Sequence, residues 1–101
     1  MPITCKLEDE RGEMLDEAND QYDLLHRLLA RPDEASKAVR FIDWYGDTTF
    51  NKLQMEPFIK EWKAFLDGAK SDDERGFLDA VLRMAKECRE GVHLYLKFYG
   101  D

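Results

Sequence analysis

Apolar and polar residues alternate near both ends of the chain, which is the pattern of half-buried β-strands. At the start, Ile3, Cys5 and Leu7 alternate with polar residues, and a glycine-containing turn separates them from a weaker return segment at 13–18. At the end, the alternation covers residues 92–99. Because a lone hairpin is marginally stable, we expect the last strand to join the first in one sheet. The inward set of the last strand is Val92, Leu94, Leu96 and Phe98, and its outward set is His93, Tyr95, Lys97 and Tyr99.

Three segments carry apolar residues at helical spacing. The first covers residues 19–32, where residue 19 or 20 can cap the start and a proline prevents continuation. The second covers residues 57–68, with proline at its first position and glycine as its cap. The third covers residues 71–91 and opens with a capping box, a serine followed three residues later by a glutamate.

These elements predict an α+β fold with a single domain at residues 1–101. A small, mostly antiparallel sheet, made of the N-terminal hairpin and the C-terminal strand, would carry about three helices on one face. With 44% apolar residues, a chain of 101 residues can bury one core. Between the first two helices the pattern is least regular, and we expect a helical turn followed by a short strand at residues 39–42.

A polar corner, residues 43–54, interrupts the amphipathic pattern. Gly46 can adopt a positive φ that its aromatic neighbours cannot cheaply adopt. Because Pro57 disfavours helical geometry at the residue before it, we expect a single turn in the corner and a helix that restarts at Pro57. Phe50 and Leu53 would anchor this turn.

Two interpretations of the polar corner stay open. In the first it is structural, and the side-chain amides of residues 51 and 54 satisfy backbone groups of the loop. In the second it is a small-molecule, partner or catalytic site, because general acid-base work needs such groups within hydrogen-bond reach. The candidate residues of this site are Asp43, Asp47, Thr48, Asn51, Gln54 and His93.

Motifs with strong chemical meaning give little support to catalysis. The sequence has no glycine-rich phosphate loop, no paired metal-ligand spacing and no nucleophile elbow, so we expect no cofactor and no metal. Whether the protein is an enzyme stays open, and a non-enzymatic role is favoured. Cys5 and Cys88 are expected to be buried free thiols, one on a strand and one on a helix.

The net charge of −7 and the pI of about 4.8 restrict the possible partners. Binding to nucleic acid needs clustered Lys and Arg, so nucleic acid and anionic membrane surfaces are disfavoured. The chain has no apolar run of roughly 20 residues and no secretory signal pattern, so cytoplasm is the expected location. A negative surface can steer a basic partner into contact.

The preferred function is that of a soluble protein–protein interaction domain, with an acidic neutraliser of a basic toxin, as immunity proteins are, as one version. The outward side chains of the last strand would form its contact surface, unless they cover a second sheet face or pack under a loop. Self-association through the free edge of the terminal strand is a further hypothesis. The contact residues would be Trp44, Tyr45, His93, Tyr95, Lys97 and Tyr99.

The corner and the closing segment together resemble a family of small uncharacterised bacterial proteins. The shared pattern is an acid, an aromatic-Gly-Asp-Thr, Phe-Asn and Leu-Gln, followed by a closing His-x-Tyr-Leu strand and a Gly-Asp end. The similarity covers residues 43–101. Relatives often have proline where Trp44 stands here, and the resemblance implies no activity.

Overall fold

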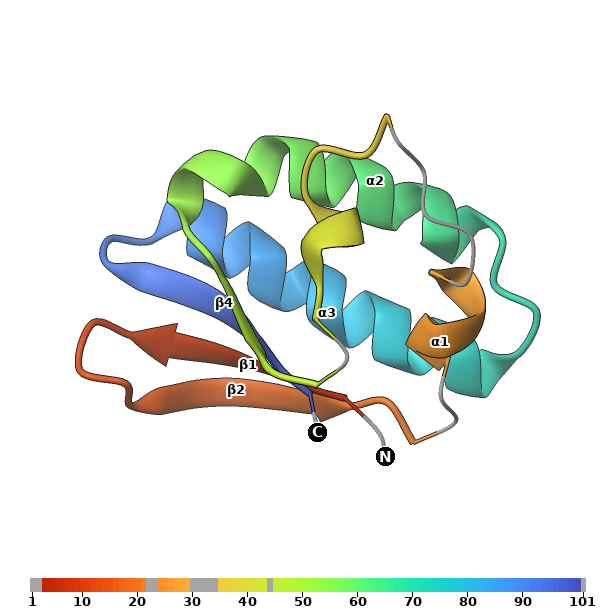
Figure 1. The fold of residues 1–101 in the computed structure, drawn as a ribbon, viewed down its shortest axis with the longest axis horizontal. Helices are drawn as coiled ribbons and strands as arrows, with labels where there is room; N and C mark the ends of the chain where they lie inside the picture. Colours follow the sequence, from red (N-terminus) through yellow and green to blue (C-terminus); the bar gives the residue numbers. More distant parts are fainter. Residues whose placement is uncertain (1–2, 22–23, 30–34, 44, 101) are drawn as a thin grey trace.

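The structure is a computed structural model of the chain, and it describes residues 3–21, 24–29, 35–43 and 45–100 (Figure 1). Strands and helices alternate irregularly along it. The strands are β1 (Thr4–Asp9), β2 (Met14–Asn19), β3 (Asp47–Phe50) and β4 (Leu94–Tyr99). The α-helices are α1 (Leu24–Leu28), α2 (Met55–Asp67) and α3 (Asp72–Glu90), and the 3-10 helices are η1 (Val39–Phe41) and η2 (Lys52–Gln54).

The four strands form one antiparallel sheet in the order β2-β1-β4-β3. This confirms the predicted α+β fold, the hairpin and the pairing of the C-terminal strand with the first strand. The expected free edge of the terminal strand was wrong, because β4 is hydrogen-bonded to β1 on one side and to β3 on the other. Self-association through that edge is therefore excluded, and the two edges of the sheet are β2 and β3.

The helices cover one face of the sheet, where α3 contacts β1, β2 and β4 and α2 packs against α3 (Figure 1). Trp62 of α2 is fully buried at the centre of this layer. Its ring stacks on Phe58 at 5.2 Å between centroids, and its Nε1 donates to the Leu78 carbonyl oxygen at 2.9 Å. The Trp62 indole therefore has both its apolar surface and its polar N–H satisfied in the core.

Two local predictions, a strand at residues 39–42 and the extent of the first helix, differ from the structure. Residues 39–42 form the η1 turn rather than a strand, because the Glu61 carboxylate accepts from the Lys37 and Val39 amides and holds the segment in a turn. Within the described residues the first helix is only α1, which is shorter than predicted. Asp20, one of the two predicted caps, accepts from the Leu24 amide as expected, whereas residue 19 belongs to β2. The predicted range also includes residues 22–23 and 30–32, which lie outside the described residues.

The second helix begins earlier than predicted. The structure shows α2 starting at Met55, with Pro57 as its third residue. Proline is tolerated there because the first four amides of a helix have no intrahelical partner. In the described part of the chain, none of the helices is long and apolar enough to cross a membrane.

Candidate functional site

The first half of the polar corner is held together by its own side chains. Asp43 Oδ1 accepts from the Tyr45 amide at 2.9 Å, and the Thr48 hydroxyl accepts from the Asp43 amide at 2.8 Å. Gly46 does not have the predicted positive φ. A Cβ at this position would lie 2.9 Å from Asp43 Oδ2, so a larger residue would have to displace the carboxylate that accepts from the Tyr45 amide.

The second half contains an edge strand and a capping box. Residues 47–50 form β3, which the sequence prediction of a single turn missed. Asn51 Oδ1 then accepts from the Leu53 and Gln54 amides, and Gln54 Oε1 accepts from the Asn51 amide. This confirms that the two amide side chains satisfy loop backbone groups. Leu53 is not an anchor, because it is 86% exposed.

The proposed catalytic grouping is not assembled. Asp47 pairs with Tyr99 at one end of β4, whereas His93 precedes β4 at its other end. Six residues of extended chain separate Tyr99 from His93, which is roughly 20 Å at about 3.3 Å per residue. His93 instead lies 3.7 Å from a carboxylate oxygen of Glu10, across the β1–β2 turn. An acid-base site joining the corner to His93 was therefore a wrong prediction.

His93 is also not part of the row of outward side chains in which it was predicted. Its φ is +56°, so the chain turns there and β4 begins one residue later. Val92, predicted on the core face, is 73% exposed. Trp44 lies outside the described residues. Tyr45 is 80% exposed just before β3.

The structure brings Tyr95, Lys97 and Tyr99 together on the face of the sheet opposite the helices, together with residues of β1. The register places Lys6 opposite Lys97 and Glu8 opposite Tyr95. We call this surface the outer face. It comprises Lys6, Glu8, Thr49, Tyr95, Lys97 and Tyr99.

A buried carboxylate lies at the centre of the outer face. Glu8 is only 4% exposed, although it points away from the core. It accepts a hydrogen bond from the Tyr99 hydroxyl, and its other oxygen is 3.3 Å from Lys97 Nζ. Lys6 Nζ lies 5.2 Å from the centroid of the Tyr99 ring. Each charge on this surface is thereby held in place by a neighbour, so the outer face is ordered before any contact.

The hydrogen bond between Tyr99 and Glu8 changes the titration of the phenol. It is the main cause that raises the pKa of Tyr99 to about 12, with burial and the negative charges of Glu8 and Asp47 as further causes. Tyr99 therefore stays neutral and a donor at physiological pH. This residue holds the outer face together and carries no activated group.

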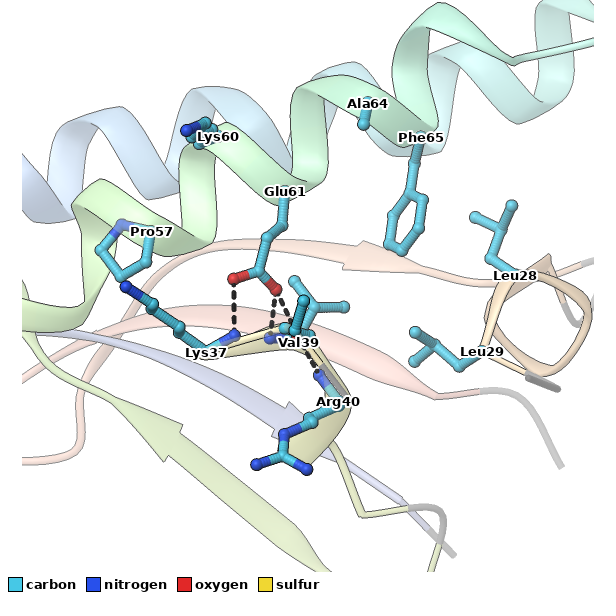
Figure 2. A pocket seen from close by; sticks show the side chains of 12 residues that line it. Leu28, Leu29, Lys37, Val39, Arg40, Pro57, Lys60, Glu61, Ala64 and Phe65 are labelled. Carbon is cyan, nitrogen blue, oxygen red and sulfur yellow. Dashed lines mark hydrogen bonds between the residues drawn. The ribbon is translucent and has the colours of Figure 1, made fainter. Parts of the chain in front are cut away.

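A cavity of about 440 Å³ lies between α2, the end of α1 and η1 (Figure 2). Its lining residues include Leu28, Leu29 and Phe65, together with Lys37 and Lys60. Glu61 is the carboxylate that lines it, and its oxygens accept from the Ser36 hydroxyl and two backbone amides. This carboxylate is committed to holding η1 and is therefore not a free group for a ligand.

The cysteines are free and buried, as predicted, with Cys5 on β1 and Cys88 on α3. Burial raises the pKa of both thiols. Among the described residues, no group of three His, Cys, Asp or Glu side chains could hold a metal ion.

Sequence reasoning missed the β1 contribution to the outer face. Lys6 and Glu8 share the parity of Thr4, so the alternation in β1 contained the signal for their orientation. Their contact with Tyr99 depends on the β1–β4 register, which one sequence does not specify. Comparisons of the chain with family models, curated proteins and solved structures found no match.

Proposed function

We propose that the protein is a non-enzymatic protein–protein interaction domain whose contact surface is the outer face. The observation that carries this proposal is the pair of tyrosines with adjacent lysines on the side of the sheet opposite the helices. Tyrosines combine a large apolar ring with a polar hydroxyl, and such residues are enriched in interface cores and hot spots. Tyr45, at 80% exposure beside β3, extends the same kind of surface.

The chemistry of the remaining polar residues supports a binding role over catalysis. The corner uses Asp43, Thr48, Asn51 and Gln54 in its own hydrogen bonds. The acceptor oxygens in these bonds already have partners, so they are explained by the corner's own structure without a ligand. The net charge of −7 favours a basic partner, because opposite charges accelerate encounter.

The test compares the proteins captured from native cell extract by the tagged wild type and by two variants. Tyr95→Ala with Thr49→Arg changes the outer face, and Lys63→Ala on the exposed side of α2 is the matched control. A captured partner should bind the control as tightly as the wild type. Its affinity for the outer-face variant should fall by at least about 30-fold, as for a hot-spot tyrosine. Equal binding to all three proteins would reject the outer face.

A further inference from the structure

The negative charge of the chain is concentrated in one hairpin. Residues 8–20 contain seven carboxylates and one arginine, so their net charge is −6, against −7 for the whole chain. This segment includes β2, which is an edge of the sheet. Met14 and Leu15 on the same strand are 47% and 53% exposed. The β2 edge therefore combines acidic and exposed apolar side chains.

A groove runs between this edge and α3. It has a volume of about 350 Å³, and Ala18 and Phe77 contribute apolar surface to it. Three carboxylates also line it, those of Glu17, Asp72 and Asp73. The groove thus offers apolar contact flanked by negative charge.

Backbone groups of β2 are also directed outward. The Asp20 amide donates to the Ile3 carbonyl oxygen, so the backbone of Asp20 faces β1. Because neighbouring residues of a strand face opposite sides, the backbone groups of Glu17 and Asn19 face away from β1. The Glu17 amide donates to Asp16 Oδ1 at 2.8 Å and the Asn19 carbonyl oxygen accepts from Gln21. The Glu17 carbonyl and the Asn19 amide point toward an incoming strand.

We propose that the β2 edge binds an extended, lysine- or arginine-rich segment of a partner protein, which adds a strand beside β2. This proposal rests on the proposed role as an interaction domain. It gives the chemical class of the partner and adds the β2 edge to the outer face as a second contact surface. Main-chain hydrogen bonds would provide affinity, and alternate side chains would fill the groove beside Phe77 or pair with the carboxylates. Positive charge on the segment complements the hairpin.

A second copy of this chain does not fit the same edge. Antiparallel pairing of β2 with itself would place two copies of the acidic hairpin side by side, and pairing centred on Glu17 would put this carboxylate opposite its own equivalent. Like charges opposite one another on paired strands are destabilising. Charge on an edge strand commonly prevents such pairing with a second copy. The negative charge of β2 does not repel a basic segment, which can therefore occupy this edge.

The probe is a capped eight-residue peptide of alternating valine and lysine, titrated into the ¹⁵N-labelled protein. We expect saturable 1:1 binding, weakened by salt, with amide shifts concentrated at residues 14–19 and 72–80. Replacing each lysine by glutamine should weaken binding by at least about tenfold, because the charge complementarity is lost. Two further peptides carry N-methyl groups on all valines or on all lysines. One of them should lose binding and the other should keep it, because only one edge of the peptide pairs with β2.

Matched variants separate the groove from general acidity. The double variant Glu17→Lys, Asp73→Lys should bind the peptide at least about tenfold more weakly. The control Glu56→Lys, Asp67→Lys on α2 makes the same change in net charge and should leave the affinity for the peptide within about twofold. Absence of binding, equal binding by both N-methylated peptides, or shifts outside the groove would overturn the proposal. If the peptide fails while the Tyr95→Ala, Thr49→Arg variant loses its captured partner, the edge is rejected and the interaction domain stands. If peptide binding succeeds and the outer-face variant keeps its partner, only the outer face is rejected.

Discussion

Replacement of Tyr99 by phenylalanine removes one hydroxyl from a buried carboxylate and tests how the outer face is ordered. Glu8 is 4% exposed and is held by the Tyr99 hydroxyl and by Lys97 at 3.3 Å. In Tyr99→Phe the carboxylate keeps the lysine and loses the hydroxyl. A hydrogen bond to a charged group contributes about 1.5 to 3 kcal/mol to stability.

The pKa of Tyr99 sets an independent limit. An increase from an ordinary value of about 10 to about 12 corresponds to at most about 2.7 kcal/mol, at 1.36 kcal/mol per pKa unit. The phenol is partly exposed, so solvent screening reduces this figure. We therefore expect Tyr99→Phe to lower the free energy of unfolding by about 1.5 kcal/mol at neutral pH.

The pH dependence has a definite sign. Because the pKa of Tyr99 is higher in the folded chain, the unfolded chain releases this proton first as the pH rises. The stabilisation is complete below a pH of about 10 and is lost as the pH rises toward about 12. The difference in stability between wild type and Tyr99→Phe should shrink over that interval.

Urea denaturation at several pH values measures this difference, and ultraviolet titration of the tyrosines identifies the phenol with a pKa of about 12. The matched control is Tyr95→Phe, on the same strand and face. Within the described residues its hydroxyl makes no hydrogen bond, so the control should change stability by less than about 0.5 kcal/mol. If Tyr99→Phe is as stable as the wild type, or the control costs as much, the reasoning is refuted.

Three further predictions follow from the backbone, a cap and a thiol. Gly91→Ala places a methyl group 2.3 Å from Leu94 Cδ1 and should lower the free energy of unfolding by about 1 to 3 kcal/mol. Gly76→Ala meets open space within α3 and should raise the free energy of unfolding by about 0.5 to 1 kcal/mol. Urea denaturation of both variants checks these opposite signs. Asp20→Ala removes the acceptor of two α1 amides at 2.8 Å and should cost about 2 kcal/mol, with Asp20→Asn intermediate; an unchanged melting temperature for Asp20→Ala would contradict the cap. Burial raises the pKa of the Cys5 thiol, so iodoacetamide at about pH 8 should modify it only as fast as the protein unfolds, and mass spectrometry that finds rapid labelling of the native protein would refute this.

The elements that sequence reasoning predicted well depend on local information. α2 and α3 have long apolar stripes, and Gly68 and Ser71 mark the end of one and the start of the other, as the structure confirms. The hairpin was also recognisable, because alternation and a glycine turn lie within one short segment. The inward set of β4 was correct from Leu94 onward.

The missed elements depend on contacts between distant residues. β3 has four residues, too few for a clear alternation, and it is a strand because it pairs with β4. Residues 39–42 have strand-forming composition, yet Glu61 of α2 captures their amides and folds them into a turn. β-propensity therefore gave way to a tertiary hydrogen bond, as it commonly does.

The polar corner shows why an unusual density of polar residues is weak evidence for a site. An edge strand that ends at Phe50 must be followed by a chain reversal into α2, and this reversal leaves amides without strand or helix partners. Asn51 and Gln54 are among the residue types that satisfy such amides, so the fold accounts for their presence. The fold does not demand Tyr95 in the same way, because its hydroxyl makes no hydrogen bond within the described part of the chain, whereas Tyr99 holds the Glu8 carboxylate. The outer face around Tyr95, rather than the polar corner, is therefore the part of the molecule that carries a side chain which the fold does not explain.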